Sequence, residues 1–198
     1  MSDRGSIYCY PNTNVLKNKL NIHDEKELMR FDARITAAKL LLLREKGIIG
    51  NFSKTHFINI HKFIFEDIYP FAGELRKENI AKGSFSFADW MYIDENIDRL
   101  LKELEDENYL LPIKDDKEKL SERLAYYLSE FNVLHPFREG NGRTIREFIR
   151  ELALKNGYEL NLKNESADEF LEASILSIVD TEKLKEKIFN CLEKKSEK

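Results

Sequence analysis

Two amphipathic segments flank a short stretch that cannot be helical, and this arrangement constrains the fold more than any other feature. The first segment is capped by Asp115 or Asp116 and has one apolar face, formed by Leu120, Leu124, Leu128 and Phe131. The second covers residues 142–156 and has a similar face, formed by Ile145, Phe148, Ile149 and Leu152. Gly157 suits the C-terminal cap of the second helix. The pattern predicts two core-facing helices joined by a short loop.

The rest of the chain also favours helices. Its 198 residues include only 8 Gly and 4 Pro. Apolar spacing and capping residues predict further helices over about Asp24–Glu45 (ending at Gly47), from Ser53 towards Pro70, over about Asp89–Glu105, from a capping box of Ser166 and Glu169, and from near Thr181. We therefore expect an all-α single domain over residues 1–198, with a charged tail that frays from about Glu193.

Residues 79–87 are the exception to this helical pattern. Ser84-Phe85-Ser86-Phe87 alternates polar and apolar residues, and Lys82-Gly83 supplies a turn, so we expect a small β-hairpin in a helical protein. A lone hairpin is only marginally stable. On these residues alone, a hairpin with a function and a packed structural flap are equally simple interpretations.

The bulk properties exclude several classes of protein. A formal net charge of -4 and a pI of about 5.7 give no global attraction to nucleic acid, so no direct nucleic-acid binding is expected. The N-terminus lacks the apolar run of a secretory signal, and the most apolar stretch, residues 35–43, is too short to span a membrane. Cys9 and Cys191 have neither metal nor redox spacing, so we expect reduced thiols in a cytoplasmic protein.

Residues 135–146 begin where the first amphipathic segment ends and finish inside the second, and they carry the candidate chemistry. Pro136 prevents the first helix from continuing, so His135 lies at a helix end. Gly140 and Gly142 allow backbone torsions that other residues avoid, and Asn141 tolerates them. The N–H groups of this loop can then face inward just ahead of a helix N-terminus, which makes an anion site.

Charged side chains add what phosphate chemistry requires. Arg143 and Arg146 lie on one helix face, and each guanidinium can bind two phosphate oxygens. Glu139 is unfavourable beside an anion unless a cation such as Mg²⁺ intervenes. His135 can accept a proton from a nucleophile. Separately, each residue has an ordinary explanation: a capping histidine, a Gly-Asn-Gly turn, or arginines paired with Glu139 and Glu147. Together they indicate phosphoryl or nucleotidyl transfer.

The string His135-Pro136-Phe137-x-Glu139-Gly140-Asn141-Gly142-Arg143-x-x-Arg146 resembles the signature of the Fic family at every defining position. The stretch from Asp67 to Arg76 is similar to the segment that precedes the flap in Fic proteins, and the expected hairpin lies where that flap should be. The resemblance covers about residues 20–180. It implies a compact all-α Fic fold with a β-hairpin flap over the nucleotide.

The resemblance also implies a reaction: AMP moves from ATP to a Tyr, Ser or Thr hydroxyl of a protein target, and pyrophosphate leaves. His135 would be the catalytic base, and Glu139 would hold Mg²⁺. The residues expected to bind the phosphates are Gly140, Asn141, Gly142, Arg143 and Arg146, the two arginines toward the β/γ end. The residues expected to hold the target by edge-strand pairing are Lys82, Gly83, Ser84, Phe85, Ser86 and Phe87.

Two departures from relatives refine the expectation. The related Doc proteins transfer a phosphate and replace the second motif glycine with a bulky cation, so Gly142 favours AMP transfer. Many Fic proteins carry an inhibitory Ser/Thr-x-x-x-Glu-Gly/Asn helix, which this sequence lacks. The nearest stretch, Thr13 to Asn18, has Lys17 where the Glu is needed. The chain therefore resembles the toxin subclass, in which a small antitoxin supplies that Glu to Arg146 in trans. A different nucleotide, or a non-catalytic nucleotide- or peptide-binding module, are the alternatives.

Overall fold

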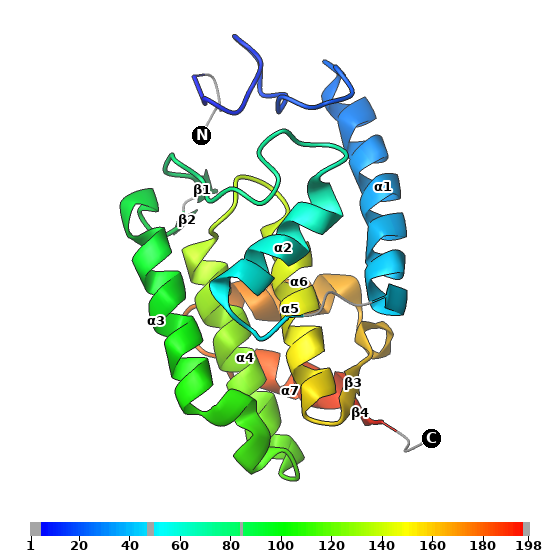
Figure 1. Ribbon diagram of the computed structural model, residues 1–198, viewed down its shortest axis with the longest axis vertical. Helices are drawn as coiled ribbons and strands as arrows, with labels where there is room; N and C mark the ends of the chain where they lie inside the picture. Colours follow the sequence, from blue (N-terminus) through cyan, green and yellow to red (C-terminus); the bar gives the residue numbers. More distant parts are fainter. Residues whose placement is uncertain (1–4, 47–49, 84, 196–198) are drawn as a thin grey trace. The chain divides into compact units, whose positions relative to one another are not determined.

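The structure is a computed structural model that describes residues 5–46, 50–83 and 85–195, so Gly47 and Ser84 lie outside the described residues. The chain forms two compact units, and each consists of two separate stretches of sequence. The first unit comprises Met1–Ile93 and Pro136–Thr144, and the second comprises Asp94–His135 and Ile145–Lys198. Figure 1 labels their elements.

The first unit is built on two helices that pack against each other, α1 (Glu25–Lys46) and α2 (Lys54–Phe65). As predicted, Ser53 caps α2, and its hydroxyl accepts a hydrogen bond from the His56 backbone N–H at 3.3 Å. The helix ends at Phe65, earlier than the expected stop at Pro70. The backbone N–H groups of Ile68 and Tyr69 both donate to the Phe65 carbonyl, so the chain leaves the helix through a turn.

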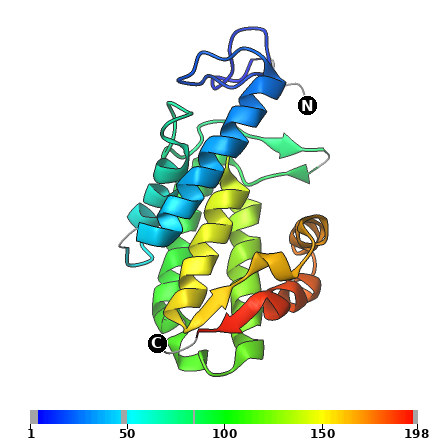
Figure 2. The same ribbon diagram turned by 90° about the vertical axis from the view of Figure 1, so that its right-hand side faces the viewer.

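The predicted hairpin is present and follows in the same unit. Strands β1 (Ala81–Lys82) and β2 (Phe85–Ser86) pair antiparallel, and the short 3-10 helix η1 (Trp90–Tyr92) comes next. Figure 2 shows the two strands as teal arrows. Gly83 has φ +62°, a torsion that favours glycine in the turn. The buried Arg76 guanidinium donates to the Glu78 and Ala88 carbonyls, and so ties together the two ends of the hairpin.

The second unit contains the remaining elements, and α3 and α5 each begin in the first unit. They are α3 (Ile93–Asp106), η2 (Asn108–Ile113), α4 (Lys117–Leu134), α5 (Asn141–Lys155), β3 (Tyr158–Leu160), η3 (Leu162–Asn164), α6 (Ala167–Leu176), α7 (Glu182–Cys191) and β4 (Leu192–Lys194). Asp116 caps α4, and Gly157 follows α5 with φ +86°, both as expected. The predicted apolar faces of α4 and α5 are buried, and α7 packs on α4 and α6.

Three expectations about the boundaries of these elements were wrong. Glu193 and Lys194 do not fray, because β4 pairs antiparallel with β3, a sheet that no local pattern predicted (Figure 2). Residues 196–198 of the expected tail lie outside the described residues. Ser166 precedes α6 but its side chain makes no capping hydrogen bond, and Glu169 pairs instead with Lys187 at 3.0 Å. Asp89 caps η1, so the helix expected from Asp89 begins only at Ile93.

No helix within the described ranges has both the length and the apolar character that crossing a lipid bilayer requires.

Candidate active site

His135 lies at the C-terminal end of α4 in the second unit, as predicted. Its backbone is left-handed, with φ 45° and ψ 60°, and its N–H still donates to the Phe131 carbonyl at 3.0 Å. The ring atom Nδ1 lies 3.2 Å from the carbonyl oxygen of Asn132. Because a carbonyl can only accept, Nδ1 carries the proton and Nε2 is the basic nitrogen of the neutral ring. The side chain is therefore in the tautomer that a general base at Nε2 requires.

Residues 136–144 form the loop and the first turn of α5 in the first unit. Gly140 has φ +82°, and a Cβ at this position would lie 2.2 Å from the Phe65 ring. Only glycine meets both conditions. Gly142, by contrast, lies inside α5, so the expectation that it adopts an unusual torsion was wrong. The first backbone N–H groups of a helix have no partner within that helix, so the start of α5 is suited to an anion.

Asn141 has a role that the sequence did not suggest. Its side chain is buried, accepts from the Phe137 N–H at 2.8 Å and donates to the Phe137 carbonyl at 2.7 Å. These bonds close the loop on itself. The Asn141 side chain therefore holds the loop in shape, and its backbone N–H lies at the start of α5.

His61, on α2, holds the loop from the other side. Its Nδ1 accepts from the Gly73 N–H at 2.8 Å, so Nε2 carries the proton and donates to the Glu139 carbonyl at 2.9 Å. The ring stacks on Phe137 with centroids 3.8 Å apart. Burial lowers the pKa of His61 to about 4, so the ring is neutral at pH 7. The neutral imidazole of His61, with both ring nitrogens hydrogen-bonded, thus holds the backbone of Glu139 in place.

This lowered pKa makes stability depend on pH. The unfolded chain binds a proton at His61 near pH 6.5 and the folded chain only near pH 4, so acid favours unfolding across that interval. From pH 7 to pH 5 we expect His61 to reduce the free energy of unfolding by about 2 kcal/mol. Urea titrations of the wild type and of His61→Gln, which cannot titrate, measure the contribution. Equal losses in the two proteins would contradict it.

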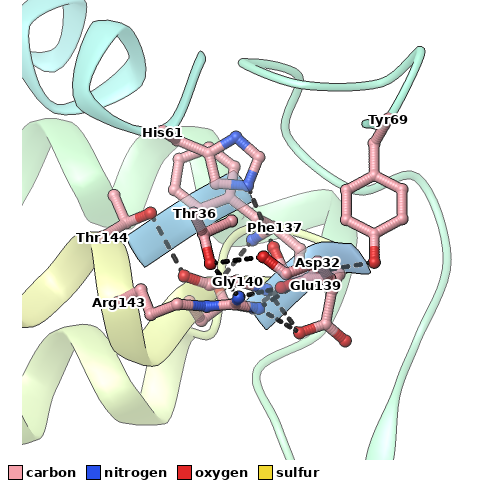
Figure 3. A network of polar contacts seen from close by, with 10 residues as sticks. Asp32, Thr36, His61, Tyr69, Phe137, Glu139, Gly140, Arg143 and Thr144 are labelled. Atoms are coloured by element: carbon pink, nitrogen blue, oxygen red, sulfur yellow. Dashed lines mark hydrogen bonds and ion pairs between the residues drawn. The ribbon is translucent and has the colours of Figure 1, made fainter. Parts of the chain in front are cut away.

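Arg143 projects from α5 into a polar network with α1 (Figure 3). Its guanidinium pairs with Asp32, donates to the Thr36 hydroxyl at 3.0 Å and lies 3.2 Å from the Glu139 carboxylate. Its carbon Cζ lies 4.6 Å from the centroid of the Phe65 ring. The ordinary explanation, an Arg143–Glu139 ion pair, is therefore confirmed. Arg143 also pairs with Asp32, which is buried and distant in sequence and was not predicted.

Glu139 is the residue suited to a metal. Its carboxylate is 39% exposed and borders a cavity of about 430 Å³, shared with Asp32, Tyr69 and Arg143. No cluster of three or more acidic, His or Cys side chains suited to a metal occurs in the described part of the chain. Mg²⁺ commonly uses one or two carboxylates and takes its other ligands from phosphates and water. The partly exposed Glu139 carboxylate, beside a loop suited to phosphates, is compatible with this mode of Mg²⁺ binding.

The other predicted residues are placed as follows. Arg146 lies on α5 within the second unit and is half-buried. In the hairpin, Lys82, Gly83 and Ser86 are exposed, and Ser84 is outside the described residues. The half-buried rings of Phe85 and Phe87 meet edge to face, with centroids 5.2 Å apart.

Sequence reasoning missed the residues that support the loop, which are Asp32, Thr36, His61, Tyr69 and Arg76. A signal existed for two of them: Asp32 and Thr36 follow Leu28 at intervals of four, on the buried face of α1. Two polar residues on a buried stripe point to a polar partner elsewhere in the chain. Nothing in the sequence identifies that partner as Arg143.

A glycine-dependent loop at a helix N-terminus, with a carboxylate and an arginine beside it, defines a helical protein of the phosphate-binding class. Residues 51–153 match the Fic/DOC family. The protein adenylyltransferase VbhT of Bartonella schoenbuchensis is 37% identical over 170 residues, which are 86% of this chain and 35% of VbhT. A Fic protein of Salmonella typhimurium is 35% identical, covering 84% of this chain and 82% of that protein. The chain belongs to the Fic/DOC family.

Solved structures agree on the fold. The N-terminal Fic domain of a VirB-translocated Bep effector protein from Bartonella quintana, crystallised with bound ADP, superposes with a TM-score of 0.90 at 23% identity. The match covers 96% of this chain and 95% of that domain. The expected all-α fold with a small hairpin is confirmed. The chain spans about a third of VbhT but most of the Salmonella protein, so its relatives include both short and long proteins.

Proposed function

We propose that this chain is a protein adenylyltransferase, which transfers AMP from ATP to a Tyr, Ser or Thr hydroxyl of a protein target and releases pyrophosphate. The observation that carries the proposal is the loop at the start of α5, where Gly140 leaves no room for a side chain and Glu139 and Arg143 stand beside it. VbhT, at 37% identity, is named for the same activity.

The roles follow from the chemistry of the residues. His135 Nε2 accepts the proton of the target hydroxyl as its oxygen attacks the α-phosphorus of ATP. The bond from that phosphorus to the bridging oxygen breaks, and pyrophosphate leaves. The backbone of Gly140, Asn141 and Gly142 binds phosphate oxygens at the helix N-terminus, and Arg143 and Arg146 bind toward the β- and γ-phosphates.

Glu139 is the residue proposed to hold Mg²⁺. Its exposed carboxylate supplies the hard oxygen ligand that this ion prefers. When bound, Mg²⁺ neutralises charge on the phosphates. Without it, the carboxylate would repel the nucleotide, so a carboxylate beside an anion-binding loop is itself a reason to expect the ion.

The hairpin is proposed to hold the target. A two-stranded sheet has unpaired backbone groups on both outer edges, and the exposed β1 and β2 offer such edges to an extended peptide. Backbone pairing tolerates varied target sequences. Its specificity would come from side chains such as Lys82 and Phe85.

The proposed setting is a bacterial toxin–antitoxin pair in the cytoplasm, where ATP is available and thiols such as the free Cys9 and Cys191 remain reduced. The sequence has no Ser/Thr-x-x-x-Glu-Gly/Asn motif. The nearest stretch, around Thr13, forms turns instead of a helix. The Asn18 side chain is buried and donates hydrogen bonds to the backbone carbonyls of Leu16 and Ile22. A separate small protein would therefore supply the inhibitory Glu to Arg146.

ATP labelled at one phosphate tests the reaction. Label on the α-phosphate should appear on a target protein, or on the chain itself, and label on the γ-phosphate should not, because AMP is transferred. Chelation of Mg²⁺ should abolish the signal. Transfer of γ-label alone would establish a phosphotransferase, and transfer only from another nucleotide would change the substrate. Binding without any transfer would support the non-catalytic module.

A further inference from the structure

Asp32 is a buried carboxylate on α1 that contacts Arg143, the arginine beside the loop of residues 136–144. Its side chain is shared between two partners: the Tyr69 hydroxyl, which donates to Oδ2 at 2.7 Å, and the Arg143 guanidinium. Asp32 is 6% exposed and Tyr69 is 3% exposed. Burial raises the pKa of the Tyr69 phenol, so its hydroxyl remains a proton donor to Asp32. Figure 3 shows the carboxylate between the two side chains.

These contacts divide the donors of Arg143 into two sets. Nη1 donates to Asp32 and to the Thr36 hydroxyl, so both of its hydrogens face α1. Nη2 lies 3.4 Å from Asp32 and 3.2 Å from Glu139. Nε makes no hydrogen bond to any residue that the structure describes. On the edge formed by Nε and Nη2, Nη2 is shared between Asp32 and Glu139, and Nε is not engaged by α1 within the described residues. An edge with two parallel donors suits a phosphate.

The Nε–Nη2 edge of Arg143 already binds an anion, the Glu139 carboxylate. This carboxylate lies against Nη2, and in the proposed reaction it would turn to Mg²⁺. That movement would leave Nη2 to a phosphate oxygen, while Asp32 and Thr36 keep the guanidinium in place. The Phe65 ring under the guanidinium restricts it further.

We propose that Asp32 is a positioning residue: it holds Arg143 so that the Nε–Nη2 edge meets the β- or γ-phosphate of ATP. The inference rests on the proposed function, because it assigns Arg143 to a phosphate. Asp32 itself touches no substrate. Its effect is to fix in advance a long side chain that would otherwise lose rotamer freedom on binding.

Calorimetric binding of two ligands tests the proposal, each in the presence of Mg²⁺. One is α,β-methylene-ATP, which cannot release pyrophosphate, and the other is AMP, which lacks the β- and γ-phosphates. Asp32→Asn keeps the shape of the side chain but removes its charge. We expect it to weaken binding of the ATP analogue roughly tenfold, the effect of about one charge-assisted hydrogen bond, and to leave AMP binding unchanged.

A double-mutant cycle with Arg143→Ala shows whether the effect passes through the arginine. In that background, Asp32→Asn should change affinity for the ATP analogue less than twofold. Tyr69→Phe supplies a milder second variant, since the carboxylate and its charge remain while one hydrogen bond to it is lost. It should weaken binding of the analogue by about twofold to threefold, again without affecting AMP.

Three results would overturn the proposal: equal losses for both ligands, which indicate a general structural role; an effect of Asp32→Asn that persists without Arg143; or unchanged affinity in a folded variant. If Asp32→Asn does not fold, an unchanged Tyr69→Phe overturns it in the same way. Failure of the proposed function is recognised separately, because the wild type would then not transfer α-labelled AMP, whether or not it binds the ATP analogue.

Discussion

Replacing His135 with alanine is expected to lower the rate of AMP transfer by about 10²–10⁴, while ATP binding and folding stay close to those of the wild type. The imidazole stands at the end of α4 with Nδ1 against the Asn132 carbonyl, so its loss removes the basic Nε2 while the backbone of α4 remains. Transfer of α-labelled AMP, together with calorimetric binding of ATP, measures the two properties separately.

A second histidine provides the matched control. His23 is exposed near the N-terminal end of α1, stacks on Tyr10 and contacts Asn21, all outside the loop of residues 135–146. His23→Ala should leave the transfer rate within about twofold of the wild type, as is usual for a surface substitution. A folded His135→Ala protein that transfers AMP at the wild-type rate would show that another group takes the proton.

Gly140→Ala is expected to destabilise the protein by about 2–5 kcal/mol and to abolish ATP binding. Two costs add here: the left-handed torsion, with φ +82°, and the collision of the new Cβ with the buried Phe65 ring. If the chain shifts to avoid the ring, the backbone N–H groups at the start of α5 no longer converge. Urea unfolding and ATP calorimetry on the same preparation test both effects.

Gly157→Ala separates these two costs. Gly157 also has a positive φ, +86°, but nothing lies within 4 Å of a Cβ built there. Its substitution should cost only the torsion, about 1–2 kcal/mol. Equal destabilisation by the two alanine variants would mean that the Phe65 ring is not the reason for glycine in the loop.

Features set by neighbouring residues could be predicted from the sequence, and features set by distant ones could not. His135 at a helix end, the Ser53 cap and the hairpin depend on a few adjacent residues, and the structure has all three. The β3–β4 sheet joins Tyr158 to Lys194, two short segments with no strong strand pattern, so it was missed.

The site shows the same division. The motif did not predict that the Asn141 side chain closes the loop or that Gly142 lies inside α5, because the helix begins one residue earlier than the glycine pattern suggested. The partner of Arg143 lies 111 residues away on α1. A polar residue on a buried helix face, such as Asp32, predicts that a polar partner exists, but the sequence does not identify the partner.

Arg76 fixes the position of the hairpin through backbone carbonyls and not through the side chains that the hairpin exposes. The side chain binds the two carbonyls at the base of the hairpin, and the Arg76 backbone N–H donates to the Pro136 carbonyl at 2.9 Å, at the start of the loop. None of these contacts uses a side chain of residues 81–86. The exposed side chains of Lys82 and Ser86 can therefore diversify between paralogues, or be exchanged by a protein engineer, while the ends of the hairpin keep the same distance from the loop of residues 136–144. In the proposed role of the hairpin, target preference can then evolve faster than the catalytic motif.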